Sequence, residues 1–465
     1  MLSFQPIPFT PLDNLLHPHP MSFILFFNVE DINAGIRILT DATSRLLQYI
    51  PLLSGVKADL PVSGFKSSKH FIVPPSNELT LQSWVKVQQL SLQMVKFHSD
   101  PVLLQQLIDR SWPTEERCLT RITITGLADG VALCLTADHY AFDGRGAFLI
   151  LEMLADICQG RSPRIVHEHE VILRNMISSL RPVSSALSRD FSKDFINYDN
   201  VVKPEFRPAL EVRSQRFTLS FPRLMKLTET CNGSWNAVPK SSKTEENISL
   251  SLNDVCVSAI ALAIMKARNK GSRSKEPSGK IDFGMAVDIR RHLGRVLDGM
   301  ASYLGNTIVA VSVHTNLPPI PIQFKKTSGL PGIVHDDIYH IFHLGKYLRK
   351  ELMAIDEDYV CHLLKFLHGN KRNEQVFLAG WGMPFSSLLR LPFYALEFGP
   401  NLGSAADFQT VFGGSDGSVY ILPRRRPMDG DAEVDTVPIE VCIALDRRDM
   451  DQLQVQPLFR WLQGN

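Results

Sequence analysis

The chain has 465 residues, a length that exceeds one ordinary domain and predicts two, each large enough for its own core. Its 49 lysines and arginines nearly balance its 48 aspartates and glutamates, so the charge does not point to nucleic acid or an anionic membrane as the main partner. A hydrophobic content of 44% with 21% charged residues is typical of a soluble globular protein rather than a disordered one.

The first part of the chain mixes predicted strands and helices. Residues 21–29 form an apolar run that is too short to cross a bilayer and predicts a buried strand, whereas residues 31–47 have helical periodicity. Residues 120–125 alternate apolar and polar side chains, and residues 131–136 predict a second strand after an Asp-Gly turn. These two strands together predict a β-hairpin that leads to His139.

The pattern after His139 predicts one clear helix and then a long irregular stretch. Residues 147–157 have helical periodicity, and the helix is expected to close near Gly160. From 164 to 208 no clean period survives, and polar and charged residues dominate. Within it, the alternating His-Glu-His-Glu run at 167–170 has no third partner for a metal ion and is expected to be a solvated loop.

The second part of the chain again mixes strands and helices. The predicted elements, in chain order, are strand 216–221, helix 222–231, helix 254–270, strands 281–287 and 307–313, strand 437–445 and a final helix at 447–462. Polar loops are expected at 232–247 and 271–280, and an irregular connection at 318–331. Because strands and helices alternate irregularly and some strands pair, the predicted class is mixed α/β.

The predicted hairpin delivers His139 into a tight turn just before a helix. An imidazole fixed by backbone on both sides suits a general base. Asp143 lies four residues later, and this spacing leaves two roles open: it could orient the imidazole as in a triad, or turn away and lock the loop. Gly144 and Gly146 are expected to let the backbone turn sharply and approach a ligand.

Other segments match one family in the same order. The form His-x-x-x-Asp-Gly at His139 is accompanied by Pro-Leu-Asp at 11–13, a Tyr-Ile-Pro-Leu-Leu-Ser-Gly run at 49–55, Asn-Asp-Val at 253–255, Val-Asp-Ile-Arg at 287–290, Tyr-Leu-Gly-Asn at 303–306, Glu-Phe-Gly-Pro-Asn at 397–401 and an Asp-Gly strand at 416–423. In this combination the chain resembles the BAHD acyltransferases, which move acyl groups from coenzyme A thioesters to alcohols or amines. It is most similar to their fungal branch, which includes trichothecene O-acetyltransferases.

The resemblance covers nearly the whole chain and implies an architecture. It implies two chloramphenicol-acetyltransferase-like domains of mixed α/β fold, with a substrate channel between them. The expected parts are an N-terminal domain at 1–185, a crossover linker at 186–211 and a C-terminal domain at 212–465. The resemblance also implies a monomer with no bound cofactor, acyl-CoA as co-substrate, and a small hydroxylated or amino natural product as acceptor.

The resemblance further implies roles for individual residues. His139 is implied as the general base. Asp143 is implied to point away from the substrate and to pair with Arg290, which would tie the histidine loop of one domain to a strand of the other; the neighbouring Arg291 is the alternative partner. Asn306, which closes the 303–306 motif, is implied as a supporting residue.

The segment at 397–401 departs from the family pattern Asp-Phe-Gly-Trp-Gly at three of five positions. Glu397 adds one methylene, Gly399 matches, and Pro400 removes both an amide donor and a large side chain. In relatives this segment lies away from the histidine and shapes the fold near the coenzyme A channel, so the change affects local geometry more than chemistry. A competing alignment would use residues 407–411.

The residues also exclude several other chemistries. No serine lies in a Gly-x-Ser-x-Gly elbow, and no Cys-x-x-Cys pair is present to hold zinc. The seven cysteines are scattered through apolar runs, which predicts buried thiols in a reducing compartment, with the cytoplasm as the expected location. A metal site and a membrane span are not expected.

Two rival functions remain open from the sequence. One is a condensation-like enzyme that takes its acyl group from a carrier protein, but such enzymes have a second histidine where this chain has Asp138. The other is a catalytically idle binding protein of the same fold, which the altered 397–401 segment suggests. The intact His139 and Asp143 weigh against this second alternative.

Overall fold

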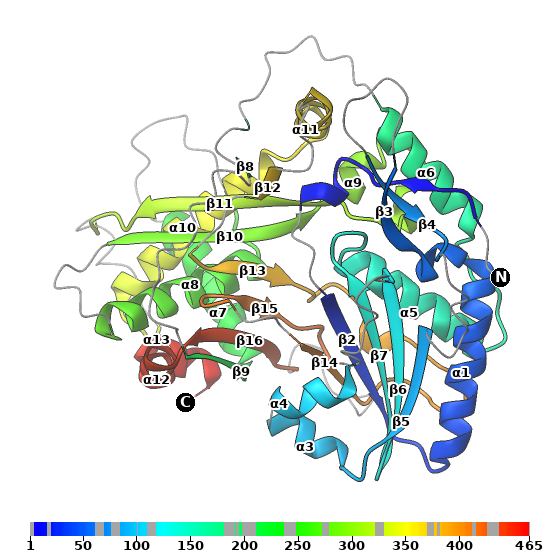
Figure 1. Ribbon diagram of the computed structural model, residues 1–465. Coiled ribbons are helices and arrows are strands. Elements are labelled where there is room, and N and C mark those ends of the chain that lie inside the picture. Colours follow the sequence, from blue (N-terminus) through cyan, green and yellow to red (C-terminus); the bar gives the residue numbers. More distant parts are fainter. Residues whose placement is uncertain are drawn as a thin grey trace.

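The computed structural model describes residues 4–15, 20–60, 69–75, 84–99, 101–108, 118–180, 191, 195–197, 211–236, 248–271, 279–320, 330–369, 376–378, 382–411, 415–425 and 437–464. In these ranges the chain forms a five-stranded and a six-stranded sheet, each covered by helices (Figure 1). The predicted mixed α/β class is therefore confirmed.

The five-stranded sheet carries the histidine motif. Its strands, in spatial order, are β14 (Asp407–Val411), β2 (Pro20–Phe27), β7 (Gly130–Asp138), β6 (Thr120–Leu127) and β5 (Val85–Gln89). All nine residues of the central strand β7 are buried, because α1 (Ile32–Tyr49) and α5 (Gly144–Cys158) cover one face of the sheet, and α3 (Met94–Ser99) and α4 (Pro101–Leu104) cover the other. The predicted hairpin of β6 and β7 is confirmed.

The six-stranded sheet belongs to the later part of the chain. Its strands, in spatial order, are β11 (Ile308–Asn316), β10 (Lys280–Asp288), β13 (Pro384–Ser387), β15 (Val419–Ile421), β16 (Ile439–Asp446) and β9 (Val212–Leu219). Figure 1 shows its helices, which are α7 (Phe221–Asn236), α8 (Leu252–Gly271), α10 (His335–Met353), α12 (Arg447–Val455) and α13 (Pro457–Gln463). The nearly continuous apolar run of α8 lies buried among them, in the core of this half.

Smaller elements complete the described fold. A three-stranded sheet has the order β1 (Ile7–Pro8), β4 (Lys69–Val73) and β3 (Val56–Leu60), and β8 (Phe195–Asn197) pairs with β12 (Val376–Leu378). The remaining helices are α6 (His167–Ser179), the short α9 (Arg290–Leu293) and α11 (Glu357–Gly369).

Three sequence predictions need correction. The stretch from 164 is not irregular at its start, because α6 occupies His167–Ser179 and buries Glu170 and Arg174 together with apolar residues. The helix predicted at 222–231 continues to Asn236 as α7. The predicted final helix is two helices separated at Gln456, because Pro457 cannot donate a backbone hydrogen bond and instead begins α13.

The division into domains at 185 and 211 stays a prediction. Most of the expected linker, 186–211, lies outside the described residues. Strand β14, from the late part of the chain, pairs with β2 in the first sheet. Residues before it, such as Phe393 and Phe398, pack in the core of that first sheet. The late part of the chain therefore contributes to both sheets.

A charged cluster joins the outer strands of the two sheets. Asp407 of β14 is almost fully buried and accepts hydrogen bonds from Arg216 of β9 at 3.3 and 3.4 Å, and from Arg425. Glu440 of β16 accepts from Arg216 at 2.7 Å and from Arg425 at 3.0 Å. The Nε2 atom of His98 lies 2.6 Å from the Asp407 carboxylate.

The His98–Asp407 pair makes stability depend on pH. The hydrogen bond to Asp407 raises the pKa of His98 above its ordinary value of 6.5, although partial burial opposes this. A raised pKa means that the contribution is fully present below pH 6.5 and is lost as the pH rises through the folded-state pKa. We therefore expect the unfolding free energy to decrease above pH 6.5 more in the wild type than in His98→Gln. Urea titrations across that range test this, and identical pH slopes would exclude the effect.

Candidate active site

The turn that carries His139 is held by its own backbone. The carbonyl of Asp138 accepts hydrogen bonds from the N–H groups of Ala141 at 2.9 Å and Phe142 at 3.1 Å. The Asp138 carboxylate accepts from the N–H of Tyr140 at 3.1 Å. His139 is partly exposed between the buried residues Asp138 and Tyr140. The imidazole of His139 therefore projects from a hydrogen-bonded turn between the strand and the helix.

Asp143 begins α5 and forms a buried ion pair with Arg290. As the N-cap, its carboxylate accepts from the N–H of Gly146 at 2.8 Å. Arg290 donates to the two carboxylate oxygens at 2.8 and 2.9 Å, in the bidentate geometry that arginine forms with carboxylates. The backbone N–H of Thr307 adds a further bond at 2.9 Å. Both Asp143 oxygens are thus used away from His139, which favours locking of the loop over a triad.

The charges of Asp143 and Arg290 are stabilised by each other and by nearby backbone groups. Burial by itself would raise the pKa of Asp143, but the charge and hydrogen bonds of Arg290 outweigh it and hold that pKa below its ordinary value. Arg290 is 6% exposed and also donates to the carbonyls of Tyr303 at 3.0 Å and Gly305 at 2.6 Å. The neighbouring Arg291 is exposed, so the structure distinguishes the two arginines. The pair links α5 to α9, which follows β10 of the second sheet.

The structure does not support the expected role of Gly144 and Gly146 in a sharp turn. Neither Gly144 nor Gly146 has a positive φ, so the turn itself does not require them. A Cβ atom on Gly146 would lie 1.9 Å from the carbonyl oxygen of Leu304. A Cβ atom on Gly144 would meet only side chains, Leu388 at 3.2 Å and Phe23 at 3.8 Å. Gly146 therefore serves the close approach of α5 to the 303–306 loop.

This contact predicts unequal effects of two matched substitutions. Gly146→Ala is expected to lower the unfolding free energy by about 1–3 kcal/mol or more, because a backbone oxygen must move. Gly144→Ala is expected to cost less, because the Leu388 side chain can shift and alanine favours the helix. Urea denaturation of both variants checks the difference, and equal losses would contradict the packing argument.

Asn306 connects the second half of the chain to the histidine turn. Its side-chain amide donates to the carbonyl oxygen of His139 at 2.9 Å. Its backbone N–H donates to the carboxylate of Asp13 at 3.2 Å. The supporting position expected for Asn306 thus corresponds to a direct contact with the backbone of His139.

A second buried charged cluster was missed from the sequence. Asp13, Glu170 and Arg174 are each fully buried, and Arg174 donates to Glu170 at 2.8 Å and to Asp13 at 3.0 Å. The prediction that 167–170 is a solvated loop is therefore wrong, because this run begins α6 and Glu170 forms a buried ion pair with Arg174. Two signals in the sequence were the Pro-Leu-Asp motif that contains Asp13 and the spacing of Glu170 and Arg174, which places these two on the same helix face.

The segment at 397–401 lies at the far end of α5. Glu397 is exposed, and its carbonyl accepts a hydrogen bond from Gln159, just after the end of that helix. Gly399 has a φ of +87° and packs against the backbone of Cys158. A helix of 15 residues is roughly 22 Å long, so this segment is remote from the His139 turn at the other end. The alternative alignment at 407–411 corresponds to β14.

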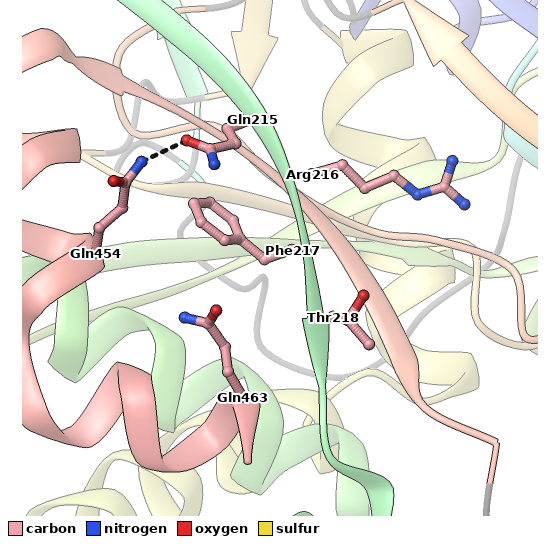
Figure 2. Close-up of a pocket in the computed structure, with 6 residues that line it drawn as sticks. All are labelled: Gln215, Arg216, Phe217, Thr218, Gln454 and Gln463. Atoms are coloured by element: carbon pink, nitrogen blue, oxygen red, sulfur yellow. Dashed lines mark hydrogen bonds between the residues drawn. The ribbon is translucent and has the colours of Figure 1, made fainter. Parts of the chain in front are cut away.

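A surface pocket elsewhere does not match the histidine motif. Figure 2 shows it between β9 and the two last helices, where Gln454 donates to Gln215 at 2.6 Å. Arg216 points away from Gln454, toward its carboxylate partners Asp407 and Glu440. The charge of the pocket is thus already neutralised, and the residues that line it include none of the motif.

The cysteine thiols are also potential reactive groups. All seven cysteines are free thiols and most are buried, as predicted. Burial raises the pKa of Cys134, Cys231 and Cys256 to about 12, so these thiols stay protonated.

Within the described ranges, no group of three His, Cys, Asp or Glu side chains could hold a metal ion. None of the helices in that part of the chain is both long and apolar enough to span a membrane.

Comparisons with known proteins identify the family of this chain. The model of the transferase family matches residues 86–458. The communesin N16 acyltransferase cnsK of Penicillium expansum is 26% identical, over 99% of this chain and 98% of that protein, and the fumigaclavine B O-acetyltransferase easN of Aspergillus fumigatus is 27% identical over the same shares. The structure of F. sporotrichioides TRI101 with coenzyme A and T-2 has a TM-score of 0.71 at 16% identity, and covers 98% of this chain and 99% of that one. This chain therefore belongs to the transferase family, as its resemblance to the BAHD acyltransferases predicted.

Proposed function

We propose that this protein transfers an acyl group from acyl-CoA to a hydroxyl or amino group of a small fungal secondary metabolite, with His139 as the general base. The observation that carries the proposal is the rigid turn that presents His139 between β7 and α5 in a chain of the transferase family. The relatives named above support acyl transfer, and their names include both an N16 acyltransferase and an O-acetyltransferase. The coenzyme A in the TRI101 structure supports acyl-CoA as the donor.

The chemistry explains why one histidine suffices. A thioester carbonyl is a good electrophile, and a thiolate leaves without help from an acid. The neutral alcohol is the poor reactant, and a base that removes its proton during attack contributes about 10²–10⁴-fold. Histidine suits this role at neutral pH. The proton would pass from the acceptor to His139, the acyl–oxygen bond would form, and the bond to sulfur would break.

A direct reaction fits the residues near the turn. A covalent relay needs an activated serine, cysteine or lysine beside a base. The neighbours of His139 in the chain are Asp138 and Tyr140. Cys134, Cys231 and Cys256 are held protonated, as described above, and make poor nucleophiles. We therefore propose transfer within a ternary complex of protein, acyl-CoA and acceptor.

The carrier-protein alternative has less support. Condensation-like enzymes have a second histidine at the position of Asp138. Here that carboxylate is buried and closes the turn by accepting the N–H of Tyr140. Asp138 therefore has a structural use in the turn, which supports a free acyl-CoA donor.

We also propose that the active site lies between two domains. The Asp143–Arg290 and Asn306–His139 contacts join the histidine turn to residues that follow β10 of the second sheet. A channel between the two halves would bring acyl-CoA and the acceptor to His139 from different sides. The boundaries proposed for the halves are those of the sequence, with the linker at 186–211.

The test is an assay of the purified protein with a panel of acyl-CoA donors and hydroxylated or amino fungal metabolites. Mass spectrometry should detect an acceptor with the added acyl mass and an equal amount of free coenzyme A. Acyl groups loaded on a carrier protein serve as the competing donor. Transfer from the carrier protein alone, or no transfer from any donor, would contradict the proposal.

A further inference from the structure

Two carbonyl groups of the His139 turn are connected by hydrogen bonds to one buried charged cluster. The three donor nitrogens of Arg174 face three different partners: Nε donates to Glu170 at 2.8 Å, Nη1 to Asp13 at 3.0 Å, and Nη2 to the carbonyl oxygen of Ala141 at 3.1 Å. Ala141 is two residues after His139. A planar guanidinium can make these bonds in one fixed arrangement. Arg174 therefore holds the turn directly.

Asp13 reaches the same turn by a second route. One carboxylate oxygen of Asp13 accepts hydrogen bonds from the Arg174 side chain and, at 2.7 Å, from the N–H of Thr10. The other oxygen accepts a hydrogen bond from the N–H of Asn306. The side chain of Asn306 then donates to the carbonyl oxygen of His139. The carbonyls of residues 139 and 141 are thus both connected to the Asp13–Arg174 pair, one through Asn306 and one directly.

Glu170 fixes the loop behind the turn. Its first carboxylate oxygen accepts from Arg174, and its second accepts from the N–H of Leu304 at 2.9 Å. The carbonyl of Leu304 is the group against which Gly146 packs. The cluster therefore holds both the His139 turn and the 303–306 loop, which α5 contacts, through hydrogen bonds.

Stability alone does not account for such a cluster. Two carboxylates and one guanidinium are fully buried here, although well-packed apolar residues of similar volume are often at least as stabilising. The bonds of the cluster instead converge on the backbone around His139. The Asp143–Arg290 pair acts at a different place, because it holds the start of α5 after the turn.

We propose that Arg174, together with Asp13 and Glu170, is a positioning unit that fixes the His139 turn for catalysis. The inference rests on the proposed function, because it gives Arg174 a part in placing the proposed base. A misplacement of about 1 Å in a reacting group can cost about a hundredfold in rate. Loss of the guanidinium should therefore reduce kcat while leaving the KM for acyl-CoA unchanged.

The first test compares two matched substitutions. Arg174→Lys keeps the charge, but a single ammonium cannot reproduce the planar fork that serves three partners. Arg216→Lys is the control, because Arg216 is mostly buried, at 13% side-chain exposure, and also bridges two carboxylates and a carbonyl, in this case Asp407, Glu440 and Phe408. We expect kcat to fall about a hundredfold in Arg174→Lys and to stay within a few-fold in the folded fraction of Arg216→Lys.

A second readout does not depend on activity. Hydrogen exchange of residues 138–143 should be faster in Arg174→Lys than in the wild type, because the Ala141 and Phe142 amides donate within the turn that Arg174 holds. Exchange there should be unchanged in Arg216→Lys. Asn306→Ala is a milder variant that removes the side-chain donor to the His139 carbonyl and keeps the backbone N–H that bonds Asp13, and it should show the same changes to a smaller degree.

The outcomes separate this inference from the proposed function. Faster exchange in the turn together with a lower kcat and an unchanged KM supports the positioning unit. Unchanged exchange in Arg174→Lys and Asn306→Ala, or a kcat equal to that of the control variant, overturns it. If the wild type transfers no acyl group from any donor, the proposed function fails, and the exchange data still decide whether the cluster anchors the turn.

Discussion

Replacing His139 with alanine is expected to lower kcat of acyl transfer by about 10²–10⁴-fold, which is the contribution of a positioned general base. The fold should persist. The turn is held by the carbonyls of Asp138, His139 and Ala141, and alanine at position 139 keeps these backbone groups. Binding of coenzyme A should also persist, because no part of the proposed role of His139 concerns the coenzyme.

Steady-state kinetics with the acceptor found in the panel assay measure this effect. His314→Ala is a suitable control, because His314 lies half-exposed on β11, where it pairs with Asp282. Melting temperature and calorimetric binding of coenzyme A should be the same for the three proteins. Turnover by His139→Ala within a few-fold of the wild type would rule out the base.

Replacing Asp143 with alanine is expected to destabilise the fold strongly rather than to impair chemistry alone. Removal of one partner leaves Arg290 as an uncompensated buried charge, which costs about 3–5 kcal/mol. That cost is a large share of the roughly 5–15 kcal/mol by which proteins are stable. We expect a lower melting temperature and a smaller soluble fraction.

A double substitution separates the structural role of the pair from a triad role. In Asp143→Leu with Arg290→Met both charges are removed, so much of the stability lost in Asp143→Ala should return. Thermal melts of the single and double variants measure the coupling between the two residues. A normal melting curve for Asp143→Ala, combined with lost activity, would instead indicate that Asp143 orients the imidazole.

Local patterns were sufficient where burial follows apolar periodicity. The strands β6 and β7 and the helix α5 were predicted from the period of their apolar residues, so the histidine turn between them was placed correctly, although threonines of β6 are buried too. Helix α6 was missed because two of its four buried positions are Glu170 and Arg174, which interrupt the apolar period. The final helix was predicted too long because its period continues across Pro457.

Contacts within the candidate site could be predicted only in part. Asp143 and Arg290 are 147 residues apart, and their pairing was implied by family resemblance rather than by spacing. Asp13 and Arg174 are 161 residues apart, and each satisfies the other only after the two segments meet in the fold. A charged residue that will be buried looks in sequence like one that will be solvated, since the difference is its distant partner.

Direct transfer of the acyl group to an acceptor activated by His139 is most directly tested by initial rates at several fixed concentrations of acceptor and varied acyl-CoA. A ternary complex predicts double-reciprocal lines that intersect, and no change in the mass of the protein when acyl-CoA alone is supplied. Parallel lines, together with an acyl mass on the protein, would show a covalent intermediate and contradict the mechanism.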